Sequence, residues 1–186
     1  TIVGVVEEDE ALHGDGVRPG DVLVGYAASG LHTNGYTLAR RIVFDRAGLA
    51  LDAPLGETGQ SVADALLAVH RSYVPAIAPV LRRVHALAHI TGGGIAGNLV
   101  RVLPEGCEAV VEPASWPRPA LYRFLQQAGN VAEDEMREVF NLGVGMIAVV
   151  PSAEEDEVRA AAGRAGVETW VIGAVRAGRR DVRFAT

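Results

Sequence analysis

The sequence predicts an α+β domain in which helices pack on a mixed β-sheet. Short apolar runs typical of buried strands are interspersed with segments of helical apolar spacing, without the strict alternation of βαβ units. A length of 186 residues suits one domain with a sizeable core. Hydrophobic residues make up 49% of the chain and charged residues 22%, a balance that excludes wholesale disorder. We therefore expect residues 1–186 to form a single domain.

Apolar runs in the first half of the chain predict three strands, over residues 1–6, 21–28 and 85–91. A Gly- and Pro-rich turn over residues 13–20 separates the first two strands. Leu38, Ile42 and Val43 then recur at helical spacing, which predicts a helix that ends near Gly48.

Two further helices are expected in this half. Ser61 is a candidate N-cap for the first, and Pro75 and Pro79 prevent that helix from continuing to residue 83. The second covers residues 95–103 and follows a Gly-rich turn.

The second half of the chain predicts four strands, over residues 107–112, 144–150, 169–175 and 181–185. Pro119 is typical of the first turn of a helix, and the apolar spacing around Met136 predicts another helix. Ser152 and Glu155 are spaced as a capping box for a helix over residues 154–165. Strands and helices thus account for nearly all apolar runs.

The charge of the chain excludes several classes of function. The formal net charge is −6, which attracts neither nucleic acid nor an anionic membrane surface as a whole. All 17 basic residues are Arg, so a phosphate-binding, Schiff-base or catalytic lysine within this chain is excluded.

The single cysteine, Cys107, fits a reducing compartment, and we expect a cytoplasmic protein without a membrane span. The first residue is Thr rather than Met, which suggests a piece of a longer chain.

The first candidate loop has the sequence SGLHTNG, between a predicted strand and a predicted helix. Its backbone N–H groups and polar side chains suit a phosphate, and His32 adds a titratable group. The alternative is a polar strand-to-helix turn with Asn34 as N-cap. The phosphate-binding candidates are Ser29, Gly30, Thr33, Asn34 and Gly35.

The second candidate loop, HITGGGIAGN, matches the G-x-G-x-x-G pattern of dinucleotide-binding domains. The helix after it is short, however, and two strands and two helices precede it, so an NAD-binding domain is a weaker interpretation than a general anion site. A tight turn that needs glycine for its backbone geometry is the other alternative. The candidates for phosphate binding are Thr91, Gly92, Gly93, Gly94, Asn98 and Arg101.

The third candidate loop, FNLGVGM, contains Asn141, whose amide can both donate to and accept from a substrate amide. Gly143 would let the backbone approach a substrate closely, and an ordinary Asn/Gly helix terminus is the alternative. His85 and His89 have an i, i+4 spacing, but they lie on a predicted strand and no further ligands are evident, so we expect no metal site. His32, His89 and Asn141 are the catalytic candidates.

The three loops and their flanks resemble one enzyme family. GLHTNGYTLAR (residues 30–40), AHITGGG with NLVRVLP (88–104) and EMREVFNLGVGM (135–146) are similar to the C-terminal half of aminoimidazole ribonucleotide synthetase, also called phosphoribosylformylglycinamidine cyclo-ligase. VGVVE, GDVLVG and SW fit the same pattern in the same order. The resemblance covers nearly the whole chain. The family's N-terminal half, which binds ATP, is not part of the sequence.

The resemblance implies an ATP-dependent cyclo-ligase of de novo purine biosynthesis. ATP activates the formamide oxygen of formylglycinamidine ribonucleotide, an amidine nitrogen attacks the activated carbon, and phosphate leaves as the imidazole ring closes. The Gly-rich loops would hold phosphate, Asn34 and Asn141 a substrate amide, and His32 and His89 would manage protons. ATP and Mg²⁺ would bind mainly to the N-terminal half, with which this chain would form a homodimeric enzyme. Without that half, the chain is expected to be inactive.

Two segments depart from the family pattern. Members often carry Pro-Thr-Arg-Ile-Tyr where this chain has VHRSY over residues 69–73, and Pro-Arg where it has Val100 and Arg101. Arg71 and Tyr73 are kept, so the first departure indicates drift rather than lost function.

Two alternatives to the cyclo-ligase remain open. One is the equivalent domain of formylglycinamidine ribonucleotide synthase, and the sequence upstream of this chain would separate the two enzymes. The other is an anion-binding module without catalysis, which a native reading frame beginning near residue 1 would support.

Overall fold

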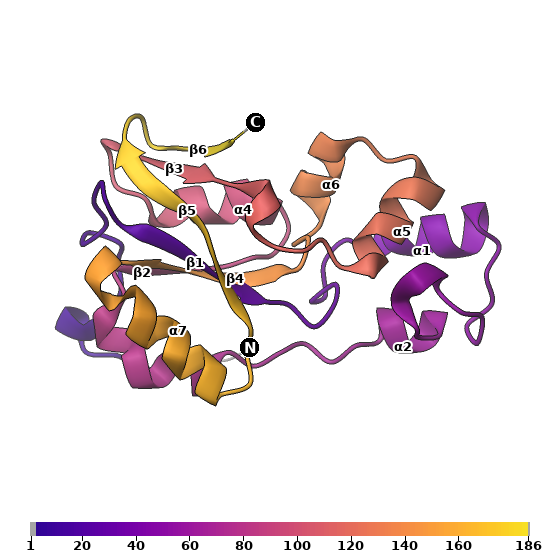
Figure 1. Ribbon diagram of the computed structural model, residues 1–186, viewed down its shortest axis with the longest axis horizontal. Coiled ribbons are helices and arrows are strands. Elements are labelled where there is room, and N and C mark those ends of the chain that lie inside the picture. The colour runs from indigo at the N-terminus through magenta and orange to yellow at the C-terminus, as the bar shows by residue number, and fades with distance from the viewer. Residues whose placement is uncertain (1–2, 186) are drawn as a thin grey trace.

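The computed structural model of the protein describes residues 3–185 and has a six-stranded sheet at its centre (Figure 1). The strand order is β2-β4-β1-β5-β3-β6, and all neighbours pair antiparallel except β3 and β6. The expected mixed sheet of an α+β domain is therefore confirmed. The strands are β1 (Val22–Ala27), β2 (Ala86–His89), β3 (Cys107–Val111), β4 (Val144–Val150), β5 (Thr169–Ala177) and β6 (Asp181–Phe184).

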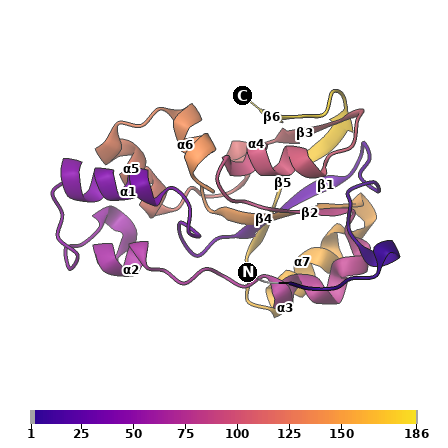
Figure 2. The ribbon, with the colours of Figure 1, turned by 180° about the vertical axis from the view of Figure 1, so that it is seen from behind.

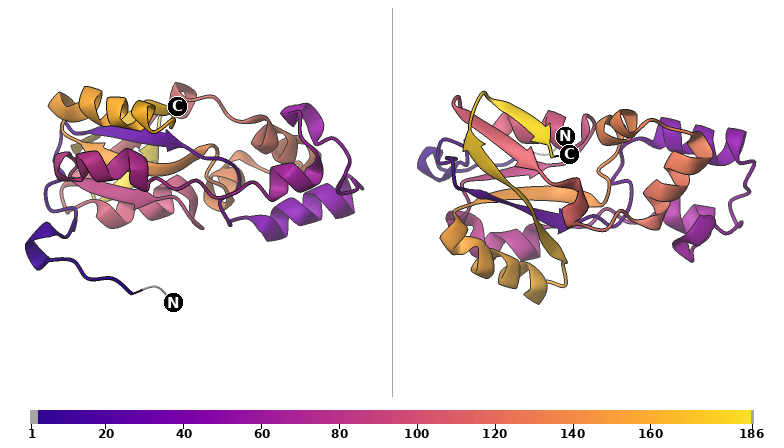
Figure 3. Two further views of the ribbon diagram at one scale, coloured as in Figure 1. Left: turned by 90° about the horizontal axis from the view of Figure 1, so that it is seen from below. Right: turned by 45° about the horizontal axis from the view of Figure 1, so that its top comes forward.

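Each face of the sheet carries its own apolar core, because successive side chains of a strand point to opposite faces. Leu23 and Ile147 belong to the core under α4 (Gly94–Leu99). Their neighbours Val24 and Ala148 belong to the other core, which α3 (Val74–Ile77) and α7 (Glu155–Arg164) cover. Figure 3 shows α7 and α4 on opposite sides of the sheet. Strands buried on both faces explain the nearly continuous apolar sequence of β4.

A helical lobe lies beside one end of the sheet (Figures 1 and 2). The third apolar core of the molecule lies within this lobe and includes Ile42, Leu125 and Phe140. The helix after the first candidate loop begins regularly and continues as a π-helical segment, η2. The lobe consists of α1 (Tyr36–Arg40), η2 (Arg41–Arg46), α2 (Val62–Leu66), α5 (Ala120–Gly129) and α6 (Glu133–Val139). Short 3-10 turns complete the chain, at Glu8–Glu10, Gly56–Thr58, Ala78–Arg83, Val100–Val102, Pro113–Ser115 and Ser152–Glu154.

The helix ends follow the local sequence. The Ser61 side chain accepts a hydrogen bond from the backbone N–H of Asp64 at 3.1 Å, as expected of an N-cap. Helix α5 begins directly after Pro119 and ends at Asn130, which adopts the left-handed conformation that closes many helices. No helix among residues 3–185 is long and apolar enough to cross a membrane.

Three sequence expectations are wrong. Residues 3–6 form no strand: Val3 and Val5 are 86% and 98% exposed, and a lone strand leaves its backbone groups unpaired. Residues 1 and 2 of that expected strand lie outside the described residues. Ser152 begins a 3-10 turn and makes no capping bond. Asn34 does not cap α1 either, because Gly35 takes the N-cap position in a left-handed conformation.

Candidate functional site

The three candidate loops meet at one end of the sheet. Strands β1 and β2 both pair antiparallel with β4, so the loops that leave β1 and β2 and the loop that enters β4 share the same edge. A Cβ atom on Gly92 would lie 3.9 Å from Oδ1 of Asn34, and Nδ2 of Asn141 donates to the Gly30 carbonyl at 2.9 Å. The first two loops thus converge, and the third joins them.

The first loop is held in a strained conformation by its own side chains. His32 and Thr33 have φ values of 52° and 67°, in the left-handed region that non-glycine residues rarely adopt. The Thr33 hydroxyl and the Asn34 amide both donate to the His32 carbonyl, the latter at 2.9 Å. The Ser29 hydroxyl donates to the Val69 carbonyl at 2.6 Å. These side chains therefore shape the loop, which sets the position of His32.

Three histidine side chains come together beside this loop. The His32 ring is 2% exposed and stacks on the His70 ring, with 4.0 Å between the ring centroids. His89, at the end of β2, places its Nε2 at 3.2 Å from Nε2 of His70. Burial, followed by the charges of His70, His89 and Arg71, lowers the pKa of His32 to about 4. Burial and then His70 also lower the pKa of His89, so both candidate proton carriers are neutral at pH 7.

His70 is the site residue that the sequence did not identify. It lies on the irregular segment between α2 and α3, far along the chain from both other histidines. The Tyr73 hydroxyl fixes this segment to the sheet by donating to the Ala27 carbonyl at 3.0 Å. The departure of VHRSY from the family pattern was the available signal, because it puts a histidine where members often have threonine.

The glycine turn of the second loop combines an open part with a packed part. Gly92 and Gly93 are exposed, and Gly93 has a φ of 92°. Gly94 is buried instead: a Cβ there would lie 1.7 Å from the Arg137 carbonyl oxygen of α6. Among the candidates of this loop, only Gly92 and Gly93 thus have the open backbone that an anion needs.

Asn98 and Thr91 tie the turn to α4 rather than projecting from it. The Asn98 amide donates to the Gly94 carbonyl at 2.7 Å, and its Oδ1 accepts from the Thr91 hydroxyl at 2.9 Å. Arg101 lies beyond the far end of α4, about 10 Å along the helix axis from the turn at a rise of 1.5 Å per residue. Arg101 is therefore not brought together with the other candidates.

The third loop is fastened to the first. Oδ1 of Asn141 lies 2.7 Å from the Tyr122 hydroxyl and accepts from the Gly143 N–H at 2.8 Å. With its bond to Gly30, the 2%-exposed Asn141 positions two loops, and its contact with a substrate stays a prediction.

Gly143 and Gly35 are both packed closely against neighbouring rings, and their contact with a ligand stays a prediction. A Cβ atom added at Gly143 would lie 2.7 Å from the Pro119 ring, and one added at Gly35 would collide with the Phe140 ring. Both residues also have positive φ values, 102° and 72°, which disfavour a side chain.

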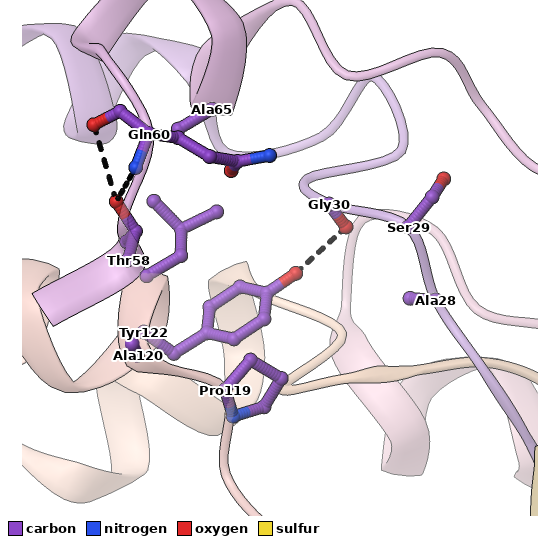
Figure 4. Close-up of a pocket in the computed structure, with 10 residues that line it drawn as sticks. Ala28, Ser29, Gly30, Thr58, Gln60, Ala65, Pro119, Ala120 and Tyr122 are labelled. Atoms are coloured by element: carbon purple, nitrogen blue, oxygen red, sulfur yellow. Dashed lines mark hydrogen bonds between the residues drawn. The ribbon is translucent and has the colours of Figure 1, made fainter.

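A pocket of about 180 Å³ opens between this end of the sheet and the helical lobe (Figure 4). Its lining includes Ser29 and Gly30 of the first loop, Thr58 and Gln60 before α2, and Tyr122 of α5. Figure 4 shows the Tyr122 hydroxyl directed at the Gly30 carbonyl, 2.7 Å away. Burial raises the pKa of Tyr122, so its hydroxyl stays protonated and acts as a hydrogen-bond donor. The first loop therefore has an open side toward the lobe.

Curated relatives match almost the whole chain. The phosphoribosylformylglycinamidine cyclo-ligase of Trichlorobacter lovleyi is 43% identical over 94% of this chain and 50% of its own length. The enzyme of the same name from Geobacter sulfurreducens is 50% identical over 84% of this chain and 45% of its own. The chain thus spans about half the length of these relatives.

Solved structures share the fold at lower sequence identity. Thiamine-monophosphate kinase from Stenotrophomonas maltophilia K279a superposes with a TM-score of 0.67 at 18% identity, over 96% of this chain and 54% of its own. The hydrogenase maturation protein HypE in complex with ATP gives 0.56 at 21% identity, over 96% and 51%. The family model "AIR synthase related protein, C-terminal domain" matches residues 18–185. The chain is therefore a member of the AIR synthase related C-terminal domain family.

Proposed function

We propose that this chain is the substrate- and phosphate-binding C-terminal domain of an ATP-dependent cyclo-ligase. The whole enzyme would close formylglycinamidine ribonucleotide to aminoimidazole ribonucleotide in purine biosynthesis. The names of the curated relatives support this reaction. The observation that carries the proposal is the meeting of three loops around two neutral histidines at one end of the sheet.

Ring closure needs a group that takes a proton from the attacking amidine nitrogen. His32 and His89 suit this task, because their lowered pKa values keep them unprotonated at pH 7. His89 is exposed and can reach a bound substrate, whereas the buried His32 stacks on His70 and would act at the inner wall of the site. The exposed N–H groups of Gly92 and Gly93 would hold the substrate phosphate or the phosphate that leaves.

The remaining parts of the site would come from outside this chain. We propose that ATP and Mg²⁺ bind mainly to an N-terminal domain, and that the complete enzyme is a cytoplasmic homodimer. HypE with ATP, and PurL of T. maritima complexed with AMPPCP, share the fold of this chain. The chain lacks lysine, which agrees with placing the ATP phosphates on another domain.

Formylglycinamidine ribonucleotide synthase is the less favoured enzyme. The T. maritima PurL structure is 15% identical to this chain and supports a common fold alone. The curated cyclo-ligases are 43–50% identical, which favours ring closure over amide transfer.

The reaction is tested with the full-length parent enzyme. We expect formylglycinamidine ribonucleotide and ATP to give aminoimidazole ribonucleotide, ADP and phosphate. A colorimetric amine assay and a measurement of ADP release would follow the reaction. His89→Gln should slow the turnover about 10²- to 10⁴-fold, the usual contribution of a general base. His13→Gln, at an exposed position in the turn before β1, is the matched control. A wild-type enzyme that forms no product contradicts the ligase, and a fully active His89→Gln variant contradicts the role of His89.

Phosphate binding is tested on the chain itself by NMR titration. Phosphate should shift the amide signals of Gly92 and Gly93, and Gly93→Val should remove this response by blocking close approach of the anion. Gly106→Val is the control, since Gly106 has a similar φ of 84°, open space around its Cβ position, and a place in the loop before β3. Equal responses from both variants, or shifts confined to other residues, would argue against this phosphate site.

A further inference from the structure

The three histidines beside the first loop form a cluster of nitrogen donors from three separate segments. His32 follows β1, His70 lies between α2 and α3, and His89 ends β2. One ring nitrogen from each lies within 4.8 Å of the other two. His32 is buried, His70 is half-buried and His89 is exposed, so an ion can reach the cluster from solvent.

The spacing of two of these nitrogens matches a metal-ligand pair. Ligand nitrogens at 2.0–2.1 Å from a tetrahedral Zn²⁺ ion are about 3.3 Å apart. Nε2 of His70 and Nε2 of His89 are 3.2 Å apart. Without a metal, two neutral rings at this distance can share only one proton between them.

His32 supplies a second and independent sign that the cluster is incomplete. Its Nε2 meets the backbone N–H and the hydroxyl of Ser29, each at 3.0 Å. Its Nδ1 is buried and has no hydrogen-bond partner among the described residues. Because a backbone N–H can only donate, Nε2 accepts it, and the neutral, 2%-exposed His32 ring carries its proton on Nδ1, a buried N–H without an acceptor among the described residues. Ligation of an ion through Nδ1 requires the other tautomer, in which Nε2–H donates to the Ser29 hydroxyl oxygen and the Ser29 N–H gives up its acceptor.

We infer that His32, His70 and His89 form a binding site for a borderline divalent transition-metal ion, with Zn²⁺ as the best match. Imidazole nitrogen suits Zn²⁺, Cu²⁺ and Ni²⁺, whereas Mg²⁺ prefers oxygen. Three histidines leave a fourth position open to water or another ligand. The site goes beyond the proposed enzyme function, and a bound ion would take the nitrogens that His32 and His89 need for proton transfer.

The present ring positions predict how the ion would enter. The His32 and His70 rings are stacked at an interplanar angle of 16°, so their in-plane lone pairs run nearly parallel. Convergence on one ion therefore requires the half-buried His70, on its irregular segment, to turn out of the stack. The nearby Arg71 guanidinium opposes a second positive charge, which lowers the expected affinity.

The test is calorimetric titration of the untagged chain with ZnCl₂ at pH 7.5, without substrate or ATP. We expect one Zn²⁺ per chain and at least tenfold weaker binding by His70→Thr. His13→Ala, at an exposed position outside the cluster, should bind as the wild type does, and millimolar MgCl₂ should not compete. Thermal melting would verify that both variants are folded. Co²⁺ should give the visible absorption of a tetrahedral site, and histidine NMR signals of all three rings should move.

Two results would overturn the inference. One is a wild-type chain that binds no Zn²⁺ under these conditions. The other is a folded His70→Thr variant that binds Zn²⁺ as tightly as the wild type, which would place the ion elsewhere. Neither result bears on cyclo-ligase activity, so this inference and the proposed function can fail separately.

Discussion

Gly94 shows how a single residue can be selected by packing although its surroundings suggest ligand binding. Its sequence context predicts a phosphate loop, yet its backbone lies against the carbonyl oxygen of Arg137 in α6. The adjacent Gly93 is exposed, and a Cβ there would make only an ordinary contact with Gly97 at 3.5 Å, although both residues have positive φ values. The sequence pattern identifies the turn correctly, but it cannot distinguish which glycine faces a ligand and which faces a neighbouring helix.

Gly94→Ala should therefore destabilise the chain strongly. The added methyl group would meet the Arg137 carbonyl at 1.7 Å at a φ of 59°, and we expect a loss of about 2–4 kcal/mol in the free energy of unfolding. Gly97→Ala in the same helix is the control. A Cβ at Gly97 meets nothing within 4 Å, so this change should stabilise the chain by about 0.5–1 kcal/mol. Urea unfolding measures both, and equal stabilities of the two variants would refute the packing argument.

At the scale of elements, one carboxylate joins three parts of the helical lobe. Glu133, at the start of α6, accepts from Arg118 before α5 at 2.5 and 2.8 Å and from Gln126 of α5 at 2.9 Å. The Arg118 hydrogen bonds are the main cause that lowers the pKa of Glu133 to about 2. The sequence explains the acidic first turn of α6 through the helix dipole, but it does not reveal this long-range pairing.

The Glu133 cluster predicts a dependence of stability on pH. The pKa of Glu133 in the folded chain is below its usual value near 4.5. The contribution of ionised Glu133 to the free energy of unfolding is therefore fully present above pH 5 and is lost as the pH falls toward 2. Glu133→Gln should cost about 1 kcal/mol at pH 7, since solvent screens the Glu133 side chain, which is 37% exposed. The difference from the wild type should shrink between pH 5 and pH 2 in urea unfolding. Glu135→Gln on the exposed side of α6 is the control, and a pH-independent difference for Glu133→Gln would contradict the pairing.

The elements themselves were largely predictable, and the misses have physical causes. Buried strands such as β1 and β4 are marked by continuous apolar runs, and Ser61 and Pro119 mark helix starts. The apolar run at residues 3–6 failed because pairing depends on partners that the run does not encode. His70 was missed for a similar reason, since the contact with His89 depends on tertiary placement of an irregular segment.

At the scale of the whole molecule, we expect the chain to fold alone but not to catalyse ring closure. Two apolar cores cover the faces of the sheet and a third lies within the helical lobe, and the hydrogen bonds of Tyr122 and Asn141 to the Gly30 carbonyl join the lobe to the sheet, which favours a single cooperative thermal transition. Calorimetry should give equal calorimetric and van't Hoff enthalpies of unfolding. ATP hydrolysis and cyclisation by the purified chain should be undetectable, because the proposed ATP site lies on another domain. A gradual melt would contradict autonomous folding, and turnover free of host enzyme would contradict the division of the site.

The Gly30 carbonyl has a consequence for how the molecule fluctuates. The Gly30 carbonyl accepts hydrogen bonds from Asn141 at 2.9 Å and from Tyr122 at 2.7 Å. These two bonds hold the helical lobe against the sheet at the candidate site. The lobe has an apolar core of its own, which allows it to open as a unit while the sheet stays intact. In amide hydrogen exchange, α5 and α6 should then lose protection together and before β1 and β4. A substrate bound beside the Gly30 carbonyl would stabilise the closed state and slow this exchange in the lobe. The affinity of the substrate could then be measured from the delay in deuterium uptake by amides that the substrate does not contact.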